Sequence, residues 1–175
     1  MSGYVAFTVL LVFVSLERIV ELVISKRNLE WSFAQGGIEY GRSHYKYMVV
    51  IHLFLLVGSL VEVWVARPVL NPLLSWSMFS LAIGSQALRW WCISTLGRRW
   101  NTLVVIIPGI PAVTAGPYKW MKHPNYVAVV IEGIALPMVG IAWRTAICFT
   151  ILNTFVLTAR LKSENVALAT LPLAP

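Results

Sequence analysis

The architecture of this chain follows from the stretch YVAVVIEGIALPMVGIAWRTAICFTILNTFVLTARL, residues 126–161. It contains two apolar runs, Tyr126–Trp143 and Thr145–Leu161, which meet at Trp143-Arg144. Each run approaches the roughly 20 residues with which an α-helix crosses a bilayer. Because so little sequence separates them, the runs predict two transmembrane helices that form a tight antiparallel hairpin.

Three further apolar segments precede this hairpin, near Tyr4–Ile24, Tyr47–Ala66 and Leu73–Thr95. The 175 residues are 58% hydrophobic, well above the roughly 45–50% of soluble domains. The mean hydropathy is +0.75. The sequence therefore predicts one all-α integral membrane domain, residues 1–175, with five transmembrane helices.

The joint between the third and fourth segments, Gly97–Asn125, is unusually long. It contains the apolar run Leu103–Ile107, and Pro108, Pro111 and Pro117 follow that run. The joint is too apolar for a free loop and too broken for a helix. We expect a re-entrant or interfacial segment, which a membrane tolerates only where it packs on protein.

The charged residues predict how the chain is oriented. Fourteen Lys and Arg face seven acidic residues, all of them Glu. Such an excess suggests nucleic-acid binding in a soluble protein, but the apolar content argues against that partner. Ten of the basic residues fall in the first and third loops and the tail, against two in the other loops. By the positive-inside rule this predicts a multi-pass protein of the cell membrane, with the N-terminus outside and the C-terminus and long joint cytoplasmic.

Polar chemistry gathers just before the fourth segment, in GPYKWMKHPNY, residues 116–126. Pro124 suits the first turn of a helix, which makes His123 the expected N-cap. The free N–H groups of such a terminus attract an anion, and Lys119 and Lys122 add positive charge. The alternative is that the lysines meet lipid headgroups and His123 only caps the helix. The two cysteines have no metal-ligand spacing, so no metal site is expected.

The expected fifth helix carries Asn153, Arg160 and Glu164 at positions i, i+7 and i+11, which share one narrow face at about 100° per residue. On the fourth helix Asn125 and Glu132 share a face, with Glu132 about 10 Å deeper. A buried carboxylate in a span is a functional candidate by default. The alternative is that Glu132 pairs with an intramembrane Arg and only joins helices. These polar groups suit a small zwitterionic ligand.

Two sequence motifs, one at each end of this hairpin, resemble motifs of a known protein family. The first is Lys122-His123-Pro124-Asn125-Tyr126, preceded by Gly116-Pro117-Tyr118, and the second is Arg160-Leu161-Lys162-Ser163-Glu164-Asn165. Over roughly the last 60 residues the chain resembles the isoprenylcysteine carboxyl methyltransferase family. The first half, with Glu39-Tyr40-Gly41, His44-Tyr45 and Arg98-Arg99-Trp100-Asn101, is similar to a short bacterial branch that O-methylates alkylpyrones and alkylresorcinols.

The resemblance implies a membrane methyltransferase that uses S-adenosylmethionine and acts on a lipophilic acceptor with a prenyl or alkyl chain. It implies that His123, Tyr126, Arg160 and Glu164 form the cofactor pocket, within a cofactor-binding part of about 97–170. The residue pattern adds Tyr118, Asn125 and Asn153 to that pocket. Two features depart from the family: Asn165 replaces a frequent second Glu, and only eleven residues follow Glu164.

Methyl transfer to oxygen is an in-line displacement that needs alignment and exclusion of water. A carboxylate acceptor needs no general base, whereas a phenol or enol does unless it is bound already ionised. We expect Arg89, Arg98 and Glu132 to be the catalytic residues, the arginines holding an anionic nucleophile. The alternative for the arginines is snorkelling within an interfacial aromatic belt.

Polar residues of the first two segments, Glu17, Arg18, Glu21, His52 and Glu62, are expected to pair helices, or else to contact a substrate head or form a proton path. The second option keeps two other functions open, a small proton-coupled transporter and a sterol-reductase-like oxidoreductase. No internal repeat is visible, and the polar groups gather at one membrane face instead of the midplane, which argues against a transporter. The sequence leaves open the acceptor, its reacting oxygen and the oligomeric state.

Overall fold

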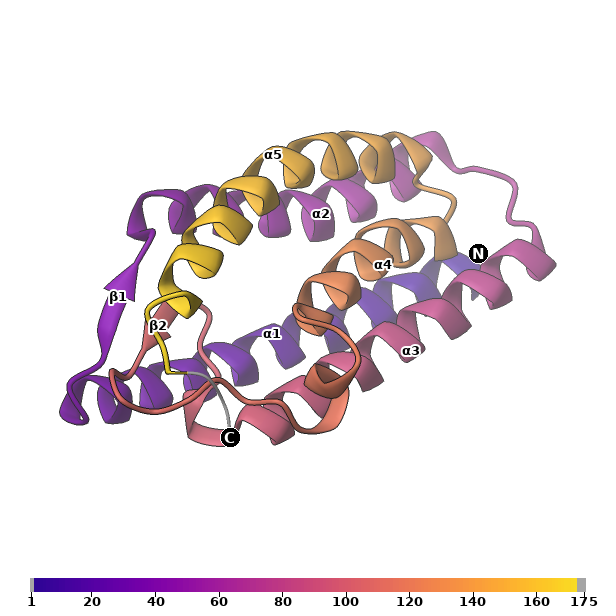
Figure 1. Ribbon diagram of the computed structural model, residues 1–175. Helices are drawn as coiled ribbons and strands as arrows, with labels where there is room; N and C mark the ends of the chain where they lie inside the picture. The colour runs from indigo at the N-terminus through magenta and orange to yellow at the C-terminus, as the bar shows by residue number, and fades with distance from the viewer. Residues whose placement is uncertain (1, 173–175) are drawn as a thin grey trace.

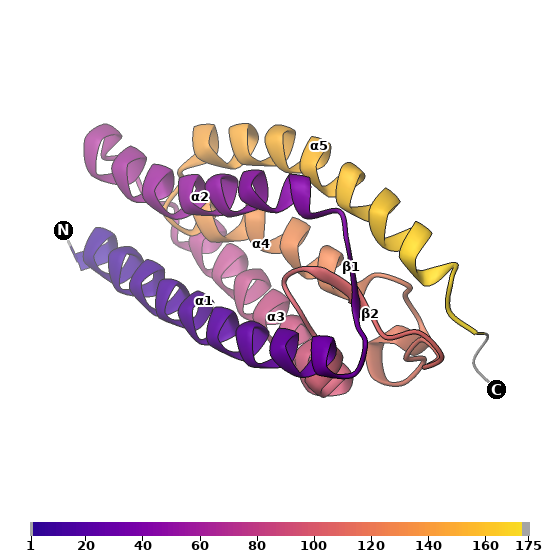
Figure 2. The ribbon, with the colours of Figure 1, turned by 90° about the vertical axis from the view of Figure 1, so that its left-hand side faces the viewer.

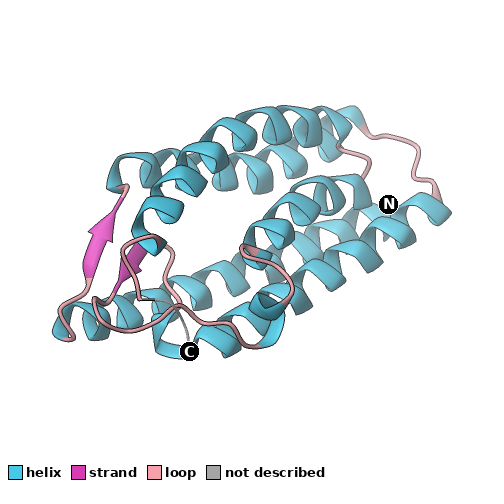
Figure 3. Ribbon diagram, in the orientation of Figure 1, coloured by secondary structure: helices cyan, strands magenta, loops and turns pink. Residues whose placement is uncertain are grey.

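The computed structural model describes residues 2–172, which form five α-helices and one small sheet (Figure 1). The helices are α1 (Ser2–Ala34), α2 (Tyr45–Ala66), α3 (Pro72–Leu96), α4 (Pro124–Val139) and α5 (Trp143–Leu168). The predicted helical class is confirmed. Four of the five predicted apolar segments each lie within one helix, whereas Tyr126–Trp143 extends past the end of α4 to the first residue of α5. Figure 3 shows that helices make up nearly all of the chain outside the long joint.

Two of the helices, α2 and α5, are long and apolar enough to cross a membrane. The shorter apolar helix α4 has 16 residues and a length of about 24 Å. Large aliphatic and aromatic side chains are exposed along α1, among them Val12, Phe13, Leu16, Ile19 and Val23. Exposed apolar surface on this scale is typical of a face that contacts lipid or protein.

Helix α1 is longer than predicted, because it continues past Ile24 to Ala34. The additional turns bury polar side chains against the long joint. The Nδ2 atom of Asn28 donates to the carbonyl oxygens of Gly97 and Trp100, over 3.1 and 2.7 Å. These bonds satisfy backbone carbonyls where α3 ends, so the extension of α1 holds the start of the joint.

The sheet pairs strand β1 (Ile38–Tyr40) antiparallel to strand β2 (Val104–Ile106), with Glu39 opposite Val105. The prediction did not include strands. Backbone pairing satisfies the polar groups of the apolar run in the long joint, which could not be buried otherwise. Val104 and Ile106 form one core cluster with Ala167 of α5. The apolar part of the joint therefore packs on protein.

The hairpin between α4 and α5 turns at residues 140–142, earlier than the predicted Trp143-Arg144. Gly140 is required there, because a Cβ atom would lie 2.8 Å from side-chain atoms of Phe7 and of Val63. Gly133 permits a similarly close approach of α4 to the ring of Phe149 on α5. Glu62 of α2 fixes the start of α5. Its Oε2 atom accepts from the backbone N of Thr145 over 2.8 Å, and its Oε1 atom accepts from that of Arg144 over 3.1 Å.

The elements that carry the polar motifs gather at one end of the helix bundle. Figure 1 shows β1, β2, the long joint and the last turns of α5 at this end, with the N-terminus at the other. Figure 2 shows α1 and α2 side by side along one side of the molecule, with α4 behind them. Residues far apart in sequence therefore meet at the end where α4 begins.

Candidate functional site

A cavity of about 620 Å³ lies at this end, between the long joint, α4 and α5. We call it the polar cavity. Its volume falls in the range of small-molecule sites, about 300–1,000 Å³. Its wall combines the apolar run of β2 with amide side chains and with charged side chains of both signs. The polar lining residues include Ser32, Arg99, Asn101, Thr114, Tyr118, Lys119, Lys122, His123, Asn125, Tyr126, Arg160, Glu164 and Asn165.

Four of these side chains form one hydrogen-bonded chain between α4 and α5. Nδ1 of His123 lies 2.9 Å from Oε1 of Glu164, and because a carboxylate only accepts, this ring nitrogen donates. The Tyr126 hydroxyl donates to Oε2 of Glu164 and accepts from Nε of Arg160, the latter over 2.8 Å. The His123 and Tyr126 rings stack at 5.5 Å between centroids. His123 and Tyr126 of the first sequence motif therefore form one cluster with Arg160 and Glu164 of the second.

Arg160 is almost completely buried, and a backbone carbonyl helps to balance its charge. Its Nη1 atom donates to the carbonyl oxygen of Thr102 over 2.6 Å. The backbone N–H of Thr102 donates to Oγ of Ser25 over 2.9 Å, and the two hydroxyl oxygens lie 2.8 Å apart. This series of contacts joins α5, the long joint and α1 beside the polar cavity.

His123 occupies the N-cap position of α4, as expected, but its side chain caps no backbone N–H of that helix. The imidazole instead bonds Glu164 through Nδ1, and its Nε2 atom lies 3.1 Å from Oδ1 of Asn165. Not every N–H group at this helix start is free as expected, because the backbone N–H of Tyr126 donates to the carbonyl oxygen of His123 over 3.1 Å. The residues Lys119 and Lys122 are exposed, at the edge of the cavity.

A second cavity, of about 490 Å³, lies between α1 and α2, and we call it the apolar groove. It runs from Thr8 to Leu22 along α1, a length of about 21 Å. Its aliphatic lining consists of Leu11, Val12, Ile19 and Leu22 from α1, of Val49, Leu53, Leu56, Val57 and Leu60 from α2, of Val129 from α4, and of Val156 and Leu157 from α5.

The polar cavity and the apolar groove share one wall. Five residues line both of them: Trp100, Asn101, Asn125, Tyr126 and Arg160. Trp100, Tyr126 and Arg160 are each buried to more than nine-tenths. A ligand in the polar cavity and a ligand in the groove would therefore both contact these side chains.

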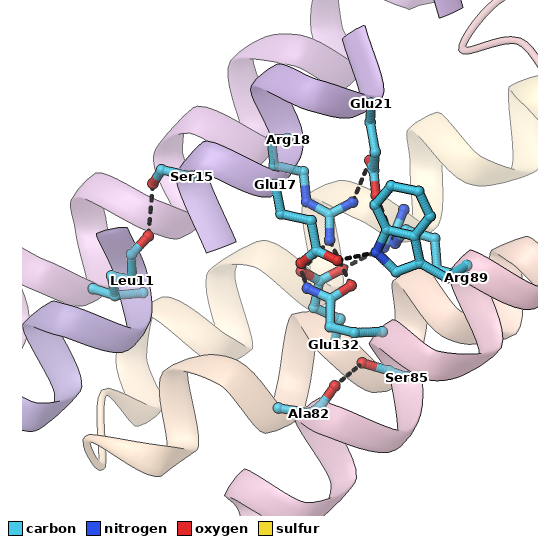
Figure 4. Close-up of polar contacts among 11 residues, drawn as sticks. Leu11, Ser15, Glu17, Arg18, Glu21, Ala82, Ser85, Arg89 and Glu132 are labelled. Atoms are coloured by element: carbon cyan, nitrogen blue, oxygen red, sulfur yellow. Dashed lines mark hydrogen bonds and ion pairs between the residues drawn. The ribbon is translucent and has the colours of Figure 1, made fainter. Parts of the chain in front are cut away.

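A buried ionic cluster lies deeper, between α1, α3 and α4 (Figure 4). Arg18 binds Oε2 of Glu21 through Nη1 over 2.5 Å and Oε1 of Glu132 through Nη2 over 2.8 Å. Arg89 binds Oε2 of Glu132 through Nη2, and its Nε lies 3.7 Å from Oε1 of Glu21. Gln86 contacts both Arg18 and Glu132. Two arginines and two glutamates balance one another in charge.

Among the described residues that line the two cavities, neither Glu132 nor Arg98 occurs. The carboxylate of Glu132 is fully engaged by Arg18, Gln86 and Arg89, which matches the helix-joining alternative. Arg98 is exposed, whereas its neighbour Arg99 lines the polar cavity. The catalytic roles expected for Glu132 and Arg98 stay predictions, and neither residue lines one of the two cavities in the described structure. Arg89 does line the groove.

Two other expected cofactor ligands lie in different places. Tyr118 lines the polar cavity, and burial raises the pKa of its phenol, which therefore stays protonated at neutral pH. Asn153 is buried and lines the apolar groove but not the polar cavity. Of the three residues expected on one face of α5, Asn153 lines the apolar groove, Glu164 lines the polar cavity and Arg160 lines both.

Sequence reasoning missed Trp100, Asn101 and Thr102 as site residues. Trp100 and Asn101 appeared within the motif Arg98-Arg99-Trp100-Asn101 of the resemblance, without a role in the site. The three residues reach the site because Ser25 and Asn28 hold this segment. For Glu21 the sequence left two options open, helix pairing and contact with a substrate head or a proton path. Glu21 lines the groove beside Arg18 and Arg89.

Comparison with known proteins agrees with the motifs. The model of the isoprenylcysteine carboxyl methyltransferase family matches residues 77–170. The chain is 33% identical to the uncharacterized protein YpbQ of Bacillus subtilis over 163 residues, 93% of this chain and 96% of that protein. It is 27% identical to an uncharacterized protein of Haemophilus influenzae over 155 residues, 87% and 88% of the two chains. No solved structure matches the chain significantly.

Proposed function

Because the chain belongs to the isoprenylcysteine carboxyl methyltransferase family, a family of membrane methyltransferases, we propose that it transfers a methyl group from S-adenosylmethionine to an oxygen of a lipophilic acceptor. The single observation that carries this proposal is the wall shared by the polar cavity and the apolar groove. A two-substrate reaction between a water-soluble and an apolar molecule needs two unlike spaces that meet.

The polar cavity holds the cofactor in this proposal, and its residues fit that molecule. S-adenosylmethionine supplies a methyl group activated on a positively charged sulfonium, together with an amino-acid end and a nucleoside. Lys119, Lys122 and Arg99 provide positive charge for a carboxylate, and Glu164 provides negative charge for an ammonium group.

The apolar groove holds the acceptor chain. Its aliphatic lining suits a prenyl or alkyl chain, and the exposed side chains Val12, Ile19 and Leu53 stand along its sides. The reacting oxygen then lies at the polar end, near Asn125, Tyr126 and Arg160. The buried wall residues of both cavities exclude water from this point, which protects an in-line displacement from hydrolysis.

We place all five helices across the membrane, with the polar cavity on the cytoplasmic side. The exposed aliphatic side chains of α1 and the apolar composition of α2 and α5 support this arrangement. The distribution of Lys and Arg supports the orientation, because the loops at the cavity end carry most of them.

Calorimetric titration of the detergent-purified protein tests the function. Micromolar binding of S-adenosylmethionine and S-adenosylhomocysteine, with no binding of NADPH, is expected. Binding of NADPH alone would instead favour a reductase-like enzyme, and binding of none of the three by folded protein would favour a transporter.

A further inference from the structure

Unpaired buried polar atoms gather at the polar end of the apolar groove. They comprise one donor, Nε of Arg89, which lies 3.7 Å from Oε1 of Glu21, and several acceptors. Among the described residues, three buried side-chain oxygens near this end have no hydrogen-bond partner: Oε1 of Glu21, Oδ1 of Asn101 and Oδ1 of Asn125. All three residues line the groove. An unpaired buried acceptor costs about 1–3 kcal/mol, so these oxygens favour a ligand that donates hydrogen bonds. A carboxylate donates none.

Glu21 is the only carboxylate of the three, and its two oxygens have different surroundings. Oε2 accepts from Arg18 over 2.5 Å. Oε1 accepts no hydrogen bond from the described residues, and its partner in the ionic cluster is Nε of Arg89 at 3.7 Å, beyond hydrogen-bond distance. The residue is 5% exposed. The ionic cluster thus holds the carboxylate charged and in place while one oxygen stays available.

The position of Glu21 brings it near the wall between the cavities. Ser25 follows Glu21 by one helical turn, about 6 Å, on the same face of α1. The hydroxyl of Ser25 contacts Thr102, whose carbonyl oxygen accepts from Arg160 in the shared wall. A ligand whose head reaches Tyr126 and Arg160 therefore passes close to Glu21.

We propose that Glu21 binds a hydroxyl group on the acceptor and takes its proton as that oxygen is methylated. This inference rests on the function proposed above. The hydroxyl oxygen forms a bond to the methyl carbon, the carbon–sulfur bond breaks with its electron pair kept by sulfur, and the proton moves to Oε1 of Glu21. The products are a methyl ether, S-adenosylhomocysteine and a protonated carboxyl. The proton of a methylated oxygen is strongly acidic, so even a carboxylate held by two arginines accepts it.

The test compares two probes of equal chain length, a phenol with a long alkyl chain and a fatty acid. Each is titrated into the protein without cofactor, and each is then offered with S-adenosylmethionine. The variants are Glu21→Gln and, as the matched control, Glu17→Gln. Glu17 lies one turn earlier on α1, accepts from Nε1 of Trp90 and does not line the groove in the described structure.

We expect wild-type protein to methylate the phenol. Glu21→Gln should lower the ratio of phenol to fatty-acid turnover by at least about 100-fold, the usual contribution of a general base. It should weaken phenol binding several-fold and strengthen fatty-acid binding, because the repulsion between two carboxylates is removed. Glu17→Gln should leave the ratio and both affinities unchanged.

Equal loss of turnover on both probes, or no loss, would overturn the role of Glu21. So would wild-type protein that binds S-adenosylmethionine but methylates only the fatty acid, or neither probe. If wild-type protein binds no S-adenosylmethionine, the proposed function itself fails and the inference fails with it, so calorimetry separates the two results.

Discussion

The hydroxyl of Tyr126 on α4 accepts a hydrogen bond from Nε of Arg160 on α5 over 2.8 Å, in the wall shared by the polar cavity and the apolar groove. The same hydroxyl donates to Glu164, and the guanidinium lies over the Tyr126 ring, 5.5 Å from its centroid. One phenol thus holds two oppositely charged side chains at fixed places on α5.

Tyr126→Phe removes this hydroxyl and keeps the ring. Hydrogen bonds to charged groups contribute about 1.5–3 kcal/mol, so we expect affinity for S-adenosylmethionine to fall roughly tenfold or more. Calorimetry measures the change, and thermal unfolding in detergent shows whether the fold is intact. An unchanged affinity would mean that Tyr126 does not organise the cofactor site.

Glu164→Ala and His123→Ala should each abolish measurable binding of S-adenosylmethionine while the protein still inserts and folds. Each change removes one partner of the 2.9 Å contact between Nδ1 of His123 and Oε1 of Glu164, which joins the start of α4 to α5. The matched control is Lys162→Ala, an exposed residue on α5 that does not line the polar cavity as described. Wild-type affinity in both variants would show that the pocket is assigned wrongly.

Glu132→Gln should destabilise the protein more than the double change Glu132→Gln with Arg89→Gln. The single change leaves a buried arginine uncompensated, a cost of about 3–5 kcal/mol, whereas the double change keeps one Arg and one Glu. The midpoint of thermal unfolding in detergent measures both. A single variant with wild-type stability and no methyl transfer would instead support the catalytic role expected for Glu132.

Glu62→Ala should lower stability by about 1–2 kcal/mol without changing cofactor affinity. The carboxylate accepts from the first backbone N–H groups of α5 and from Oγ1 of Thr145 over 2.7 Å, as a helix cap does. Glu62→Gln keeps acceptor oxygen and should recover part of the loss. A change in cofactor affinity would contradict this purely structural role.

Cysteine labelling tests the membrane orientation. In a protein whose Cys92 and Cys148 are replaced by serine, Lys122→Cys should react with a membrane-impermeant maleimide only after the cells are opened. Arg67→Cys, in the joint between α2 and α3, should react in intact cells. The reverse pattern would show that the polar cavity faces outward.

Local sequence was enough to predict the helices, because continuous apolar runs of near-membrane length favour helix wherever they lie. It was also enough to name His123, Tyr126, Arg160 and Glu164, whose spacing within two short motifs is set by one helix start and one helix face. The sheet could not be predicted, because β1 and β2 are three residues each and need one another across a long sequence separation.

The ionic cluster shows why the places of the other polar residues could not be predicted without the tertiary structure. Arg18 meets Gln86 and Glu132 across 68 and 114 positions of sequence. The sequence shows which of these residues are charged, but it does not show which opposite charge lies beside each of them. Packing of α1 against α3 and α4 engages Glu132 completely and leaves one oxygen of Glu21 available. A charged side chain that is buried away from water is stable only beside an opposite charge or a hydrogen-bond partner. Here those partners come from distant parts of the sequence, so only the tertiary structure shows which oxygen is paired.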